Sequence, residues 1–170
     1  MLGPTDYHPV PVADAWDETP ALRGVRLLLP PALAAQHTVP GQVLKVKTAP
    51  GEGFFALASA PSVDGSVELL FKRGGKVADA ALAEAVPGGD LSVTAPFGRG
   101  FPIAPALGHD VLLFAAGSGI SPIRALLQAL LRRSGIQGRW PASLDAGPES
   151  RSAGVTPPRE PAPLRITSRP

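Results

Sequence analysis

Residues 117–122 have the composition and spacing of a loop that binds a phosphate group. The run reads Gly117-Ser118-Gly119-Ile120-Ser121-Pro122 and follows the apolar stretch 110–116. Ser121 is a favourable N-cap and Pro122 suits a first helical position, so the pattern predicts a helix that begins here. A helix N-terminus collects free N–H groups and the positive end of the helix dipole, which suits a phosphate. An ordinary turn between a strand and a helix has the same composition, so that interpretation stays open.

A hydrolase nucleophile elbow at Ser121 is the second alternative for this loop, and the sequence argues against it. Such an elbow needs a small residue at position 123, which is isoleucine here. Its histidine must also follow the serine in the chain. All three histidines (His8, His37 and His109) precede Ser121, so we reject a serine hydrolase and assign no catalytic side chain.

The elements that must position this loop are a strand before it and a helix after it. The unbroken apolar run 110–116 predicts a strand that is buried on both faces. Apolar residues then recur at helical spacing up to Gly135, which can end the helix: Ile123, Leu126, Leu127, Leu130 and Leu131. This pattern predicts that a parallel-sheet domain starts near Gly108.

The first hundred residues predict a different architecture. Short runs with strand composition are separated by turn residues, and this spacing favours a small antiparallel barrel or sandwich. Two prolines in 8–14 argue for an edge strand or an extended entry, and 42–48 alternates with its lysines outward. The alanine-rich stretch 77–86 predicts one inserted helix. The six predicted strands are 8–14, 22–29, 42–48, 54–60, 66–72 and 90–95.

Residues 136–170 supply no further element of the predicted second domain. They are rich in arginine, serine, glycine and proline, with seven prolines from Gly135 onward and no periodicity, which predicts a disordered tail. One strand and one helix cannot bury both faces of a sheet. We therefore expect a truncated chain or an end read in a wrong frame, with a natural tail as the alternative. Without a sheet to join, the leucines at 126, 127, 130 and 131 should be partly exposed.

Composition narrows the classes of function. The chain of 170 residues has no cysteine, which rules out a cysteine-held zinc or iron–sulfur site, and its isolated histidines predict no metal site. The net charge of +2 comes wholly from the last 36 residues, and no basic stripe is interleaved with aromatics, so nucleic acid is not expected. No run reaches membrane-spanning length and the N-terminus is not a secretory signal, so we expect a cytoplasmic protein away from membranes.

The order of these segments resembles the ferredoxin–NADP reductase-like family over roughly residues 5–134. The resemblance is carried by Pro40-Gly41-Gln42, by the strand at 54–59, by 68–77, by Pro96-Phe97-Gly98-Arg99-Gly100-Phe101 and above all by 116–122. It implies an all-β antiparallel Greek-key barrel that binds flavin, at 5–105. It further implies the first, incomplete βα unit of a nicotinamide dinucleotide domain at 108–135, with the tail at 136–170.

The resemblance also implies where the cofactors bind. The family's flavin strand usually reads Arg-x-Tyr-Ser, and the matching positions here are Gly53, Phe55 and Ala56. Phe55 can stack on a ring, but Gly53 brings no charge and Ala56 no hydrogen bond. Plain barrel core is the alternative for Phe54 and Phe55. The residues expected to contact the flavin ring are Phe55, Ala56, Leu57, Ala58 and Ser59.

In the family, the inserted helix receives the flavin pyrophosphate at its N-terminus. The matching residues are Gly74, Gly75, Lys76 and Val77, with Lys72 as a further phosphate partner. A solvated surface is the alternative for both lysines. The residues expected to bind the nicotinamide dinucleotide are Gly117, Ser118, Gly119, Ile120, Ser121 and Pro122.

The implied function is an FAD-dependent oxidoreductase that moves electrons between NAD(P)H and an acceptor, with FMN as the second choice of flavin. Its partners would be the two nucleotides and a protein that accepts electrons or completes the enzyme. The alternative is a non-catalytic barrel module, either a pseudo-reductase without flavin or an electron-transfer subunit that needs a partner. The glycine at 53 and the alanine at 56 favour this alternative, and the 117–122 loop favours the enzyme.

Overall fold

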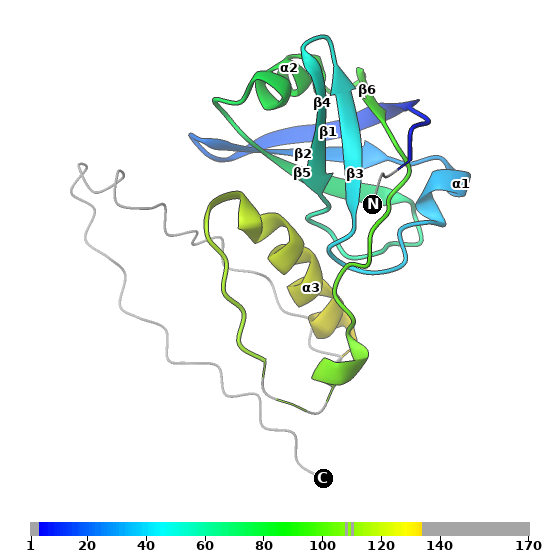
Figure 1. Ribbon diagram of the computed structural model, residues 1–170, viewed down its shortest axis with the longest axis vertical. Coiled ribbons are helices and arrows are strands. Elements are labelled where there is room, and N and C mark those ends of the chain that lie inside the picture. The colour runs from blue at the N-terminus through cyan, green and yellow to red at the C-terminus, as the bar shows by residue number, and fades with distance from the viewer. Residues whose placement is uncertain (1–3, 108, 110, 134–170) are drawn as a thin grey trace, which may run out of the picture.

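The computed structural model describes residues 4–107, 109 and 111–133. Its centre is one antiparallel sheet of six strands in the order β4-β3-β6-β1-β2-β5 (Figure 1). The strands are β1 (His8–Thr19), β2 (Leu22–Leu28), β3 (Val43–Thr48), β4 (Gly51–Ala56), β5 (Ser66–Lys72) and β6 (Asp90–Val93).

The sheet curls until its two outer strands meet. Leu57, the residue after β4, pairs with Leu69 of β5 in an isolated antiparallel bridge. The Ala58 N–H also donates to the Glu68 carbonyl at 2.7 Å. Because these contacts join the two edges, the sheet closes into a barrel and covers edges that would otherwise be open. The predicted antiparallel barrel of about six strands is confirmed.

The helices lie at the margins of this barrel. The short α1 (Pro31–Ala34) follows β2, and α2 (Lys76–Glu84) is inserted between β5 and β6 as predicted. Two single 3-10 turns, η1 (Ala104–Ala106) and η2 (Gly117–Gly119), precede α3 (Ile120–Arg133). Figure 1 shows α2 at one end of the barrel and α3 beside the barrel away from α2. Among the described residues, no helix has the length and apolar character needed to span a bilayer.

The core fills the inside of the barrel. On β5 the alternate apolar residues Val67, Leu69 and Phe71 are at most 1% exposed. Helix α2 covers this core with small side chains, and Ala81 is fully buried. Lys45 was expected outward in solvent, yet it is only 6% exposed. Its ammonium group lies 3.5 Å from Glu52 and over the Phe54 ring, which together cover it.

The prediction for β1 is wrong, because this strand is long and central. Its first part, His8–Pro11, pairs only with β6, and its second part, from Val12, pairs with β2. Both prolines therefore lie where β1 has one neighbour, so the missing N–H groups cost no ladder hydrogen bond on the other side. The strand is central in the order of the sheet and an edge only over its first residues.

The predicted bounds of β4 are also corrected. The strand was predicted at 54–60, but it begins at Gly51, because Thr48 pairs with Gly51 and Val46 with Gly53. The strand ends at Ala56. Residues 57–60 leave the β3 ladder and pass to β5, which is how the barrel closes.

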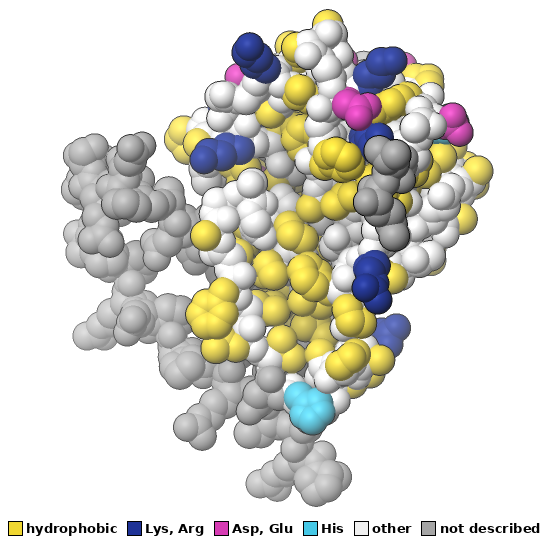
Figure 2. Space-filling view, in the orientation of Figure 1, with side chains coloured by type: hydrophobic (Ala, Val, Ile, Leu, Met, Phe, Trp, Pro, Cys, Tyr) yellow, Lys and Arg dark blue, Asp and Glu magenta, His cyan; other side chains and the backbone are white. Residues whose placement is uncertain are grey.

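Residues 111–116 do not form the buried strand that their apolar run predicts. Within the described part of the chain they pair with no strand, and Val111, Leu112 and Phe114 are 43%, 78% and 79% exposed. An extended segment becomes a strand only through a hydrogen-bonded neighbour. Figure 2 shows hydrophobic side chains gathered on the lower part of this face, around α3. The predicted disordered tail, 136–170, lies outside the described residues.

Helix α3 begins earlier than the sequence predicts. It starts at Ile120, directly after η2, so Ser121 lies inside the first turn and is not the N-cap. The side chain of Ser121 is buried. The leucines at 126, 127, 130 and 131 are all half-buried, which confirms that they are partly exposed.

Candidate functional site

Strand β4 presents two neighbouring phenylalanines to opposite sides. Phe54 points outward and is 63% exposed, with its ring edge-on to Phe97 at a centroid distance of 6.2 Å. Phe55 is half-buried and its ring centroid lies 4.6 Å from that of Phe71. Successive residues of a strand face opposite sides, so only one of the pair can line a site next to the core. Phe55 is that residue.

Gly53 lies beneath the Phe55 ring and beside α2. A Cβ atom on Gly53 would lie 3.0 Å from Phe55 Cε2 and 3.2 Å from Val77 Cγ1. The close approach places β4 directly beside the first turn of α2. It also leaves no room for a larger side chain at position 53 unless Phe55 or Val77 moves.

The turn into α2 is open and rich in cations. Gly74 has a φ of +95°, which favours glycine, and Gly75 is the N-cap without a side-chain capping hydrogen bond. The Gly74 N–H donates to Asp79 Oδ1 at 2.9 Å. Lys72 and Lys76 flank the turn and are exposed. A helix N-terminus with two exposed lysines suits an anionic group.

Arg73 stands between these lysines but is engaged elsewhere. Its guanidinium group lies 2.8 Å from Asp17 Oδ1 on β1. This hydrogen bond, together with one from Arg23, holds the pKa of Asp17 below its usual range against a smaller opposing effect of burial. The cations left to act on a ligand at this turn are therefore Lys72 and Lys76.

The segment after β4 builds the barrel wall. The N–H groups of Leu57 and Ala58 donate to the carbonyls of Gln42 and Glu68. Ser59 Oγ accepts the Glu68 N–H at 2.9 Å. All three side chains are buried, and the N–H groups of Leu57 and Ala58 are already used within the protein. Of the five predicted ring contacts, Phe55 and Ala56 retain accessible side chains, and both are half-buried.

The 117–119 loop lies near β5. Gly117 has a φ of +55°, and all three loop residues are exposed. The next residue, Ile120, packs against a small cluster formed by Leu22, Ala58 and Leu70. Ser121 and Pro122 follow inside α3, so their backbone belongs to the helix. The start of α3 thus packs on the part of the barrel built by β2, β5 and the segment after β4.

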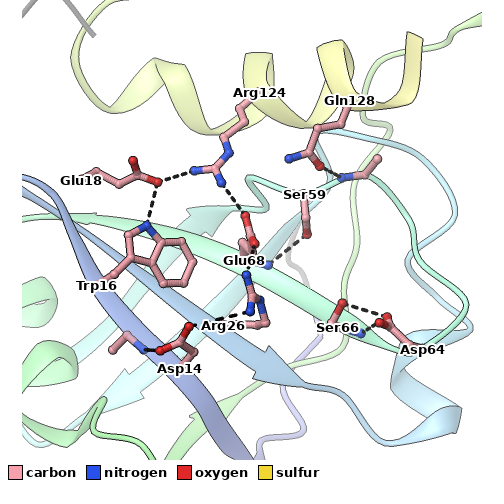
Figure 3. Close-up of polar contacts among 12 residues, drawn as sticks. Asp14, Trp16, Glu18, Arg26, Ser59, Asp64, Ser66, Glu68, Arg124 and Gln128 are labelled. Carbon is pink, nitrogen blue, oxygen red and sulfur yellow. Dashed lines mark hydrogen bonds and ion pairs between the residues drawn. The ribbon is translucent and has the colours of Figure 1, made fainter. Parts of the chain in front are cut away.

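A polar network that the sequence interpretation missed joins α3 to the barrel (Figure 3). Arg124 donates to Glu18 Oε1 at 2.6 Å and to Glu68 Oε2 at 2.8 Å. Glu68 also accepts from Arg26 at 3.0 Å, and Glu18 accepts from Trp16 Nε1 at 2.9 Å. The side chains of Arg124, Glu18 and Glu68 keep 23%, 15% and 13% of their surface exposed. The two carboxylates satisfy both terminal nitrogens of Arg124.

The described residues contain no group of three histidines, cysteines, aspartates or glutamates placed to hold a metal ion. The half-buried Phe55 ring and the lysine-flanked α2 turn suit the binding of an aromatic, anionic ligand. The Gly117 loop offers a second anionic subsite.

No family model matches the chain. Among curated proteins, sulfhydrogenase 1 subunit gamma of Pyrococcus furiosus is 36% identical over 99 residues, which is 56% of this chain and 33% of that protein. The electron transfer subunit of dihydroorotate dehydrogenase B (NAD(+)) of Bacillus caldolyticus is 32% identical over 120 residues, covering 66% and 46%. This chain therefore spans less than half the length of either relative.

Solved structures resemble the same region. The ferredoxin reductase in carbazole 1,9a-dioxygenase, in its FAD apo form, superposes with a TM-score of 0.63 at 23% identity, over 76% of this chain and 40% of that one. The ferredoxin-NADP+ reductase from Plasmodium falciparum superposes with a TM-score of 0.59 at 13% identity, over 74% and 53%. At these identities the likeness establishes the fold.

Proposed function

The described part of this chain is built on the ferredoxin–NADP reductase-like fold, and from that premise we propose that it binds FAD and moves electrons between NAD(P)H and an acceptor. The observation that carries the proposal is the contact between β4 and α2. A Cβ atom on Gly53 would contact both the Phe55 ring and Val77, so the Phe55 ring lies beside the N-terminus of α2. An aromatic ring next to an anion-binding turn matches the two ends of a flavin nucleotide.

The resemblance implies four contacts with FAD, and the residues present can supply two of them. Phe55 would contact the flavin ring by its accessible edge or face. The N–H groups at the start of α2, with Lys72 and Lys76 on either side, would hold the pyrophosphate. Strand β4 offers no arginine at Gly53 and no hydroxyl at Ala56, so affinity must come from the helix turn, the lysines and the aromatic contact. Bound FAD supplies the capacity to accept a hydride and release single electrons.

The Gly117–Gly119 loop is proposed to hold a phosphate of NAD(P)H. Both glycines are exposed, and a Cβ atom on either would meet nothing within 4 Å. A nucleotide phosphate can therefore approach the backbone N–H groups from solvent. The curated relatives named above are subunits of larger enzymes, and this supports a protein partner that accepts the electrons or completes the enzyme.

The two phenylalanines of β4 provide a matched test. We expect Phe55→Leu to raise the Kd for FAD by up to about tenfold, since an aromatic pair contributes ~0.5–1.5 kcal/mol beyond its buried area. Phe54→Leu removes the same ring from the outer side and should leave the Kd unchanged. A fluorescence titration with FAD measures both, and thermal unfolding without FAD checks that each variant folds. Equal Kd values for Phe55→Leu and the wild type would contradict the proposed ring site.

A second function is favoured by one specific observation. The missing arginine and hydroxyl at Gly53 and Ala56 suit a non-catalytic barrel module, either a pseudo-reductase without flavin or an electron-transfer subunit that needs a partner. A folded chain that takes up no FAD would be the pseudo-reductase. For a chain that holds FAD, adding NADPH without oxygen separates the oxidoreductase from the electron-transfer subunit. Loss of the flavin absorbance supports the oxidoreductase. An unchanged spectrum in a chain that holds FAD supports a module that depends on a partner.

A further inference from the structure

Helix α3 contacts the barrel through polar side chains spaced one turn apart. Arg124, Gln128 and Arg132 lie at intervals of four residues, so they share one face of the helix. Gln128 Oε1 accepts the Ala60 N–H at 3.0 Å, and Arg132 donates to the Pro61 carbonyl at 2.8 Å. Figure 3 shows Arg124 and Gln128 both pointing from α3 toward the barrel.

Few side chains of α3 are fully buried. They are Ser121, Ala125 and Ala129, which are short and bury little apolar area. Ile120 packs against a small hydrophobic cluster, and the leucines of the helix are half-buried. The polar row formed by Arg124, Gln128 and Arg132 adds directional contacts that these apolar side chains do not supply.

The loop at the start of α3 is not held by its own packing. Residues 115–119 are exposed, and a Cβ atom on Gly117 or Gly119 would meet nothing within 4 Å. A local hydrogen bond from the Gly119 N–H to the Ala116 carbonyl at 3.0 Å shapes the turn. It does not tie the turn to the barrel, whereas α3, which follows the turn directly, is hydrogen-bonded to the barrel.

Arg124 is the member of the polar row nearest to the loop, and its contacts reach furthest into the barrel. Glu18 belongs to β1 and Glu68 to β5, so the guanidinium group bridges two strands that flank β2. Hydrogen bonds between charged groups are stronger than those between neutral groups, and the side chains of Arg124, Glu18 and Glu68 are mostly buried. We infer that Arg124 is a positioning residue that holds the Gly117–Gly119 loop against the barrel through Glu18 and Glu68.

The carboxylate contacts of Arg124 also argue against its binding a phosphate directly. Both terminal nitrogens already donate to carboxylates, so a phosphate would have to displace Glu18 or Glu68 to bind there. The expected effect of Arg124 on nucleotide binding rests on the proposed function of the loop. The docking of α3 itself does not depend on that function.

The test compares Arg124→Gln and Arg124→Lys with Arg133→Gln, an exposed arginine at the end of the same helix. Trp140, the second tryptophan of the chain, is replaced by phenylalanine in every protein, so that emission reports Trp16 beside Glu18. Hydrogen exchange of the α3 amides is measured with the β3 and β5 amides as internal controls for folding. The Kd for NADPH is measured by nicotinamide fluorescence.

We expect Arg124→Gln to speed exchange of the α3 amides by about tenfold or more, to shift the Trp16 emission and to raise the Kd for NADPH. Arg124→Lys keeps the positive charge but cannot donate to both carboxylates from one planar group, so all three of its values should lie between those of Arg124→Gln and the parent. Arg133→Gln should match the parent. Exchange and emission in Arg124→Gln equal to those of Arg133→Gln would overturn the inference. So would a weaker NADPH affinity with α3 fully protected, because Arg124 would then be a direct ligand. If the parent binds no NADPH, the proposed function fails, and exchange alone decides the positioning role.

Discussion

Acid should destabilise this protein through one buried histidine, His37. Its side chain is 6% exposed, and neither ring nitrogen has a hydrogen-bond partner among the described residues. Burial lowers the pKa of His37 from 6.5 to about 4, because the charged imidazolium would lose its hydration without gaining a partner. The perturbation is therefore a change of pH from 7 to about 4.5.

The sign and the size follow from proton linkage. Above pH 6.5 the ring is neutral in the folded and the unfolded chain, so the free energy of unfolding does not depend on this group. Between about 6.5 and 4 the unfolded chain binds a proton that the folded chain does not, so stability falls as the pH falls. A pKa difference of about 2.5 units at ~1.36 kcal/mol per unit limits the loss to about 3 kcal/mol.

Urea unfolding at a series of pH values measures this loss. We expect the free energy of unfolding of the parent to fall by about 2–3 kcal/mol between pH 7 and 4.5. His37→Leu should remove most of that dependence, while His8→Gln, at an exposed position of β1, should keep it. A His37→Leu protein with the same slope as the parent would refute the reasoning.

Two further predictions concern the close contact of Gly24 with Trp16 and the turn that contains Asp64. Gly24→Ala should lower the free energy of unfolding by about 1–3 kcal/mol, because its Cβ would lie 2.3 Å from the Trp16 ring. Gly119→Ala, which meets nothing within 4 Å, is the control in the same urea assay. Hydrogen bonds from Ser62 and Ser66 lower the pKa of Asp64 to about 2, so stability from this turn should be lost as the pH falls from about 4 to 2. Asp64→Asn should flatten that part of the curve, and an unchanged acid slope would contradict it.

The alternation of apolar and polar residues predicts correctly which side chains of β5 are buried. Strand β5 has Val67, Leu69 and Phe71 inside, as expected from every second residue being apolar. The prolines of β1 misled, because a proline forbids a hydrogen bond on one side of a strand only. The sequence does not say on which side a neighbour is absent. Likewise, an apolar run such as 111–116 predicts burial only if a neighbouring strand exists to pair with it.

The glycine turns could be predicted, and the network around Arg124 could not. Gly74 and Gly117 have positive φ angles, and such turns leave a local mark in the sequence. The partners of Arg124 lie 106 and 56 residues away along the chain, so no local pattern links them. The spacing of Arg124, Gln128 and Arg132 is the signal that could have indicated a polar helix face.

An absorbance spectrum of the purified chain, recorded after FAD is added and the excess removed, shows whether the barrel binds flavin. We expect a bound flavin band at about 450 nm, with close to one FAD per chain. Such a band would mean that Phe55 and the α2 turn hold the cofactor without an arginine at position 53. A colourless, folded chain would contradict the claim and leave a barrel of the same fold that binds no flavin.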